Sequence, residues 1–251
     1  MCGRFAVTTC PALLAQQMDA IDETAAIKPD DGVQAGTGYC GANYNVAPTD
    51  TVTAVISAAG RRRLRSMRWG LVPSWSAAGP GGRLLINARA ETLDTSPVFS
   101  EPARGARCLV PMAGWYEWHR GTATGGTAHR RVGAKAASTP YYLFALDGQP
   151  LMMAGLWTRW HPPEGSAPLD SVAIITAGAT GALVAIHDRM PVPIGAGEWD
   201  RWLDPEQPLP AGLLHSDGDN IGVREVSRLV NSVRNNGPAL IEPAFGEQTL
   251  F

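Results

Sequence analysis

Short segments of β-favouring residues recur along the chain, and stretches that contain glycine or proline separate them. This pattern is typical of a β-rich fold. We predict strands over residues 2–7, 51–57, 62–69, 108–118, 141–146, 151–157 and 172–177, and a last strand and turn over 223–233. We predict short helices over residues 11–20, 180–186 and 197–203. Many strands with few helices favour an α+β fold in which a curled sheet or partial barrel carries a few peripheral helices.

No stretch of the chain has the composition of a linker, so residues 1–251 are predicted to form one domain. Residues 22–40 and 121–138 are predicted to be a surface excursion and a hairpin tip, because both are rich in glycine. No run of about 18 apolar residues predicts a membrane span. The N-terminus also lacks the basic and apolar segments of a secretory signal.

The four cysteines (Cys2, Cys10, Cys40 and Cys108) have no CxxC spacing, which makes a metal site or a disulfide framework a weak interpretation. We therefore expect no metal and no other cofactor. We expect a cytoplasmic protein, associated with the nucleoid if the source is bacterial. A reducing compartment would keep Cys2 as a thiol.

The net charge of −2 does not indicate a general nucleic-acid binder. Only Lys28 and Lys135 are lysines, and the other nineteen basic residues are arginines, whose planar fork suits phosphate. The codon usage of a GC-rich genome explains the same bias. A nucleic-acid site in this chain must therefore be a local patch.

Cys2 becomes a terminal 1,2-aminothiol if Met1 is removed. Its amine and thiol have reference pKa values of about 8 and about 8.5, so both are partly unprotonated near neutral pH. With an aldehyde the pair can close a thiazolidine ring, whereas with an amide or ester the thiolate can act as an acyl-transfer nucleophile. A third interpretation is a buried cysteine without function. Position alone leaves all three open.

Two internal clusters carry candidate catalytic groups. Asn87 can donate to a sugar hydroxyl or an oxyanion, and Arg89 can hold a phosphate, although an asparagine cap at a helix start fits the same residues. Glu117 lies among aromatic residues, and alternation places it on the same strand face as Trp115. Desolvation there would raise the pKa of Glu117 and suit it to acid/base catalysis, unless it faces water on an edge strand.

Three further features are candidates. His187 has polar neighbours and is followed by Pro191, which suits a proton shuttle or a phosphate contact, although a lone histidine is usually structural. Trp75 is an apolar side chain in a glycine- and proline-rich loop over 72–83. Residues 226–236 are polar and basic, but this alone is weak support for any function.

Six motifs occur in a recognisable order: MCGRF at 1–5, YNVAP at 44–48, WGLVP at 69–73, INARAE at 86–91, GWYEW at 114–118 and IHDRMP at 186–191. The set resembles the SRAP family, the SOS-response-associated peptidases or abasic-site processing proteins. The resemblance runs from residue 2 to about residue 240. Any one motif would be weak, whereas six in order are highly specific.

The resemblance implies a protein that binds single-stranded DNA containing an abasic site and cross-links to it through Cys2, shielding the lesion in the DNA damage response. We expect the protein to be a monomer. It implies that Asn87 holds the opened sugar and that Glu117 assists ring opening and Schiff-base chemistry. His187 would be a second acid/base at the sugar, also involved in reversing the link. The peptidase label would correspond to removal of Met1 or cleavage of the terminal residue.

The resemblance also implies a DNA-binding set. Arg4 and Arg89 match positions that hold flanking phosphates, Asn45 lines the same floor, and Arg189 belongs to the same set. Trp75 matches a wedge against bases. Some relatives have two adjacent tryptophans in that loop, whereas serines flank Trp75.

Two other functions compete with this expectation. Class II glutamine amidotransferases also begin Met-Cys-Gly, but they need an Asn-Gly element for the oxyanion hole. The sole Asn-Gly pair here is Asn236-Gly237, near the C-terminus, and Arg4 replaces an expected aliphatic residue. The second alternative is a non-covalent single-stranded DNA binder in which Cys2 is inert.

Overall fold

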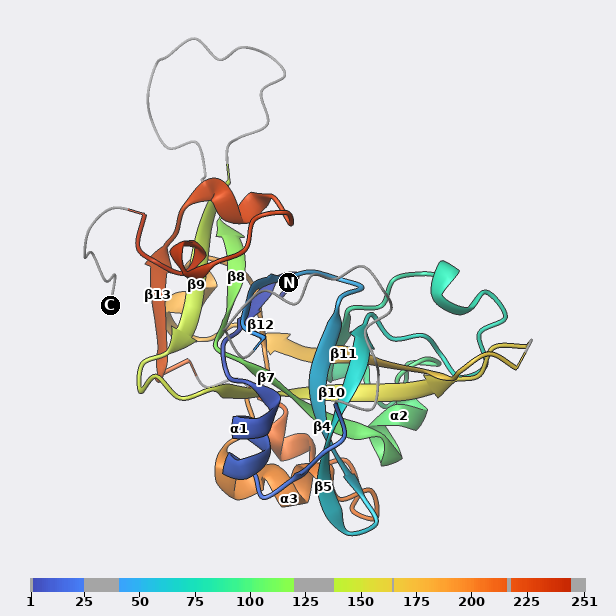
Figure 1. Cartoon of the computed structure of the whole chain (residues 1–251). Coiled ribbons are helices and arrows are strands. Elements are labelled where there is room, and N and C mark those ends of the chain that lie inside the picture. The colour runs from blue at the N-terminus through green and yellow to red at the C-terminus, as the bar shows by residue number, and fades with distance from the viewer. Residues whose placement is uncertain (1, 25–40, 120–137, 164, 216–217, 245–251) are drawn as a thin grey trace.

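The structure is a computed structural model that describes residues 2–24, 41–119, 138–163, 165–215 and 218–244. Residues 121–137 of the predicted insertion and most of the predicted excursion at 22–40 lie outside these residues. Two β-sheets form the body of the molecule, and short helices lie at its periphery (Figure 1). The expected β-rich α+β fold with a curled sheet is therefore confirmed.

The first sheet has five strands in the order β13-β9-β8-β1-β3. Their bounds are β1 Phe5–Val7, β3 Asn43–Val46, β8 Gly114–His119, β9 Thr139–Ala145 and β13 Ile221–Glu225. All of its pairings are antiparallel. β8 pairs with β9 along its whole length and with β1 at Gly114 and Trp115, so its first residues are in the interior of the sheet.

The second sheet has eight strands in the order β12-β11-β10-β7-β4-β5-β2, with β6 also paired to β11. Their bounds are β2 Ile21–Asp22, β4 Thr51–Ala58, β5 Arg61–Trp69, β6 Asn87–Arg89, β7 Arg107–Met112, β10 Leu151–Trp160, β11 Leu169–Gly178 and β12 Arg189–Pro191. The sheet curls until the end of β5 pairs with β11 at Ser171↔Arg68 and Val172↔Trp69. β4 and β5 are the predicted strand pair. Ala59 and Gly60 join them, both with positive φ, as a two-residue hairpin turn requires.

The central core lies between the two sheets. It includes Phe5 and Trp115 from the first sheet and Val52, Trp69 and Ile174 from the second. Side chains alternate along each strand, so the residues next to these core residues point to the opposite face of their sheet. On β8, Trp115 joins the central core, whereas Tyr116 joins a smaller cluster on the outer face of the first sheet.

Helices cover the outer face of the second sheet. They are α1 Pro11–Gln17, α2 Ser100–Gly105 and α3 Trp199–Leu203, which contribute buried side chains such as Leu14, Ala103 and Trp202. No helix in the described ranges is both long and apolar enough to span a membrane. Two 3-10 helices, Arg228–Asn231 and Pro238–Leu240, lie beside the first sheet and bury Val230 and Leu240 on its outer face.

Two predicted elements need correction. The strand predicted over 108–118 is two strands in different sheets, β7 and β8, because the chain crosses between the sheets at Ala113. Gly114 begins the second of these, where a Cβ would lie 2.3 Å from the Leu143 carbonyl oxygen of β9. The helix predicted over 180–186 is a 3-10 helix, Gly181–Ala185. The last strand and turn predicted over 223–233 correspond to β13, which ends at Glu225, and to the 3-10 helix Arg228–Asn231 that follows it.

Candidate active site

A cavity of about 500 Å³ opens where the end of β8 faces the segment before β12. Its lining comprises Glu117, Trp118 and His119 from β8 and residues 184–188 from the opposite segment. Two motifs that lie about 70 residues apart in the sequence therefore meet at one hollow. Glu117 and His187, the two predicted acid/base residues, line the same cavity.

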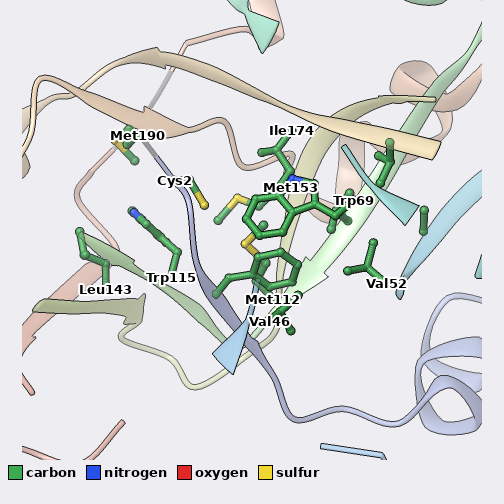
Figure 2. Packing of buried hydrophobic residues seen from close by; sticks show 14 of the residues in the cluster. Cys2, Val46, Val52, Trp69, Met112, Trp115, Leu143, Met153, Ile174 and Met190 are labelled. Carbon is green, nitrogen blue, oxygen red and sulfur yellow. The ribbon is translucent and has the colours of Figure 1, made fainter. Parts of the chain in front are cut away.

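Cys2 lies immediately before β1 and is completely buried in the chain that carries Met1. It belongs to the central core with Trp115 and Met190, as Figure 2 shows. Burial raises the pKa of the Cys2 thiol, and the charge of Glu117 raises it further. The thiol is therefore protonated at neutral pH in this state of the chain.

Asn87 connects the motif at 86–91 to the N-terminus. Its Nδ2 donates a hydrogen bond to the Cys2 carbonyl oxygen at 2.8 Å. Its Oδ1 is buried and has no hydrogen-bond partner in the part of the chain that the structure describes. Asn87 begins β6, which pairs in parallel with β11 at Ile174, so the helix-cap interpretation is wrong. A group entering the site could donate to this Oδ1.

Glu117 is 3% exposed, so the interpretation as a water-facing edge residue is wrong. Burial raises its pKa from the ordinary value to about 7, and the charge of Asp188 acts in the same direction. A carboxyl group with this pKa exists in both protonation states near neutral pH. It can therefore donate a proton in one step and accept one in another.

His187 follows the 3-10 helix Gly181–Ala185. Its Nδ1 accepts a hydrogen bond from the backbone N–H of Arg189 at 3.0 Å, and burial lowers the pKa of the imidazole. Nδ1 also lies 2.9 Å from Asp188 Oδ1, but a proton can occupy that contact only if Nδ1 is protonated. The neutral ring with its proton on Nε2 is the form that satisfies the backbone contact.

Arg189 and Arg89 differ in what surrounds them. The Arg189 guanidinium donates to both Glu91 carboxylate oxygens at 2.9 Å and also to the Thr176 carbonyl oxygen. This ion pair joins the motif at 86–91 to the motif at 186–191. Arg89 is exposed, and no side-chain contact within the described residues occupies its guanidinium. Arg89 is therefore the more available of the two for a phosphate.

Arg4 and Asn45 form a pair on the outer side of the first sheet. Arg4 Nη1 donates to Asn45 Oδ1 at 2.6 Å and to the Val230 carbonyl oxygen at 3.0 Å. Asn45 Nδ2 donates to the carbonyl oxygens of Ser232 and Asn235. Both predicted DNA-binding residues thus hold the segment after β13 in place. Asn45 is itself only 3% exposed.

Trp75 is 65% exposed in the loop between β5 and β6, as expected of an apolar residue in that loop.

Trp118 was not among the predicted site residues, although it lines the cavity. The Arg4 guanidinium lies 5.9 Å from the centroid of its ring. The aromatic run at 115–118 could have identified Trp118 as a site residue.

In the described ranges, no group of three or more His, Cys, Asp or Glu side chains is placed to hold a metal ion.

The chain is similar to known sequences over nearly its whole length. The family model described as SOS response associated peptidase (SRAP) matches residues 1–233. The abasic site processing protein YoqW of Bacillus subtilis is 36% identical over 246 residues, covering 96% of this chain and 99% of that protein. The abasic site processing protein YedK of Escherichia coli is 30% identical and covers 97% of this chain and 100% of its own length.

Solved structures share the fold. A protein from Bacteroides thetaiotaomicron superimposes with a TM-score of 0.78 over 97% of this chain and 100% of its own, at 21% identity. A phage-related protein from Bordetella bronchiseptica gives a TM-score of 0.64 over 90% of this chain and 95% of its own, at 25% identity.

Proposed function

The chain belongs to the SOS response associated peptidase family, and from this membership we propose that it processes abasic sites in DNA through Cys2. Relatives that match nearly the whole chain carry the name abasic site processing protein. The glutamine amidotransferase alternative is set aside on the same ground. We further propose that the substrate is single-stranded and that the protein acts as a cytoplasmic monomer.

The proposed reaction begins once Met1 is removed and the Cys2 amine is free. An abasic deoxyribose opens to an aldehyde at C1. The amine adds to this carbon and water leaves, which gives a C=N bond. The Cys2 sulfur then adds to the same carbon, and its proton passes to the nitrogen through an acid/base group. One C–N bond and one C–S bond replace the C=O bond, and the product is a thiazolidine.

Three side chains support this sequence of steps. Glu117, with a pKa of about 7, can donate a proton during ring opening and accept one from the thiol. Neutral His187 lines the same cavity and can present Nε2–H to a sugar oxygen. Asn87 holds Cys2 and has an unused buried acceptor for a sugar hydroxyl. We assign Arg89 and Arg4 to flanking phosphates and Trp75 to base contact.

One observation carries most of this proposal: the hydrogen bond between Asn87 Nδ2 and the Cys2 carbonyl oxygen. It joins the N-terminal cysteine to a polar group that can also bind a sugar. Catalysis by positioning requires such a contact, because small displacements of a reacting group cost large factors in rate.

A denaturing gel tests the proposal. The purified protein, shown by mass to lack Met1, is mixed with a single-stranded oligonucleotide that carries one abasic site. We expect a heat-tolerant shifted band that is absent with intact DNA and absent for Cys2→Ala. If wild type without Met1 binds the oligonucleotide but gives no covalent band, the non-covalent alternative is correct and the cross-linking proposal is wrong.

A further inference from the structure

We propose that the segment from Arg228 to Asn236 is a second contact surface for single-stranded DNA, one that grips the strand next to the lesion. This inference rests on the proposed function, because the ligand is the strand that enters the same site. The segment follows β13 and includes the 3-10 helix Arg228–Asn231. In Figure 1 it is the red stretch that lies across the end of β8 and β9.

The segment is continuous with the candidate site. Trp118, which lines the cavity, donates from Nε1 to Asn231 Oδ1 at 2.7 Å. The guanidinium of Arg4 lies over the Trp118 ring and donates to the Val230 carbonyl oxygen. A strand that leaves the cavity past Trp118 therefore meets this segment next.

Contacts with β3 and with the outer face of the first sheet also hold the segment in place. Asn45 Nδ2 donates to the Ser232 and Asn235 carbonyl oxygens, and the backbone N–H of Tyr44 donates to Asn236 Oδ1. Val230 is fully buried against the outer face of the first sheet. These contacts use the backbone and the inner side chains, so the outward side chains are presented at fixed positions.

The outward side chains have the chemistry of a single-strand surface. Arg228 and Arg234 are exposed, and no ion pair within the described part of the chain neutralises either one. Leu229 and Val233 are 56% and 58% exposed, so two apolar side chains belong to the same exposed segment as these arginines. Residues 226–241 contain no acidic residue although the whole chain has a net charge of −2. Guanidinium groups beside apolar surface suit phosphates and the faces of unpaired bases.

A hollow lies at the far end of the segment. It has a volume of about 260 Å³ and is lined by Ala42, Tyr44 and residues 236–238. An aromatic residue beside an amide at such a hollow can receive an unpaired base by stacking. The segment therefore runs from Asn231, which contacts Trp118 at the cavity, to a second hollow at 236–238. Arg234 lies between these two points in the sequence, and Arg228 lies three residues before Asn231.

The test compares two double variants. Arg228→Ala with Arg234→Ala removes the proposed phosphate contacts. Arg61→Ala with Arg104→Ala is the control, because both arginines are exposed and lie at the tip of the β4–β5 hairpin and at the end of α2, on the opposite side of the molecule in Figure 1. Both pairs remove the same charge, so any difference between them reports position. Circular dichroism checks that both variants fold.

Affinity is measured with an intact single-stranded oligonucleotide against salt concentration. Losing two phosphate contacts lowers the salt slope by about 1.4, so over a tenfold rise in salt the wild-type advantage should shrink by about 25-fold. The control should keep the wild-type slope. Equal slopes for wild type and Arg228→Ala with Arg234→Ala would overturn the proposal.

Cross-linking separates this inference from the proposed function. With an abasic trinucleotide, which has only one nucleotide on each side of the lesion, wild type and the Arg228/Arg234 variant should react at similar rates. With a long abasic oligonucleotide at low concentration, the variant should react more slowly than both wild type and the control. If wild type reacts with neither DNA, the proposed function fails. If it reacts with both and the variant equals it on both, only the second surface is wrong.

Discussion

Asn87 Nδ2 donates a hydrogen bond to the Cys2 carbonyl oxygen at 2.8 Å, although 85 residues separate the two in the sequence. The bond fixes the backbone of the residue that would react. Asn87 Oδ1 is buried and has no hydrogen-bond partner among the described residues, so the same amide has an acceptor left for a second group. Asn87 is thereby suited to orient both reactants.

Replacing Asn87 should slow the reaction more than it weakens the fold. Asn87→Ala removes one hydrogen bond, which lowers the free energy of unfolding by about 1 kcal/mol. The rate of cross-linking should fall by about 100-fold, because Cys2 loses its positioning. The control is Asn220→Ala, which removes an exposed amide that donates to Asp147. A cross-linking rate within a factor of two of wild type would contradict the positioning role.

Glu117→Gln should make stability less sensitive to pH. The folded-state pKa of Glu117 is raised from 4.5 to about 7, so the folded protein holds this proton more tightly than the unfolded chain does. Its stabilising contribution is fully present below pH 4.5 and is lost as pH rises through 7. The shift corresponds to roughly 3 kcal/mol.

Denaturant unfolding at two pH values measures this effect. At pH 8, Glu117→Gln should be more stable than wild type by up to roughly 3 kcal/mol. Near pH 4 the two should be nearly equal. The control is Glu101→Gln, which changes an exposed carboxyl group in the first turn of α2. A variant that is less stable than wild type at pH 8 would show that Glu117 is not desolvated.

The same variant should change the pH profile of cross-linking. Wild type should show an inflection near pH 7, where Glu117 changes protonation state. Glu117→Gln should lose that inflection and react more slowly, while it binds intact single-stranded DNA nearly as well as wild type. An unchanged profile would remove Glu117 from the chemistry.

His187 should be a neutral imidazole with its proton on Nε2 at neutral pH. Nitrogen chemical shifts of labelled protein should show Nδ1 as the unprotonated atom, because it accepts the Arg189 backbone N–H. The titration midpoint should lie below the ordinary value of 6.5, since burial lowers the pKa. A proton found on Nδ1, or a midpoint above 6.5, would contradict this assignment.

Replacing Arg189 should lower stability, whereas replacing Arg89 should weaken DNA binding. Arg189→Ala breaks the ion pair with Glu91 and should lower the free energy of unfolding by about 2 kcal/mol, as loss of charged hydrogen bonds does. Arg89→Ala changes an exposed side chain and should alter stability by less than about 0.5 kcal/mol. Its affinity for single-stranded DNA should nevertheless fall. Chemical denaturation and DNA titration of both variants test the contrast, and equal stability losses would contradict it.

Local patterns predicted much of the fold. The β4–β5 hairpin followed from two β-type runs joined through Gly60, and alternation placed Trp115 and Glu117 on one face of β8. These features depend on neighbouring residues alone. The split of residues 108–118 into β7 and β8 was missed, because apolar residues continue across the boundary. The two strands differ in the structure because β7 belongs to the second sheet and β8 to the first.

The candidate site was predicted through its motifs rather than through its geometry. Nothing in the sequence near Asn87 shows that its amide reaches Cys2, because the contact depends on parallel pairing of β6 with β11. Likewise, Arg189 is expected in the DNA-binding set, and nothing near it in the sequence shows that Glu91 from another motif pairs with its guanidinium. Contacts between distant segments decide which polar side chains remain available for a ligand.

Peptide mapping of the cross-linked protein tests the central claim most directly. After reaction with single-stranded abasic DNA and digestion, the account predicts one modified peptide that begins at Cys2, with a mass increase for the sugar remnant minus one water. Its thiol should resist alkylation and its adduct should resist borohydride, since a thiazolidine has neither a free thiol nor a C=N bond. An adduct on any other residue, or on a peptide that still carries Met1, would contradict the account.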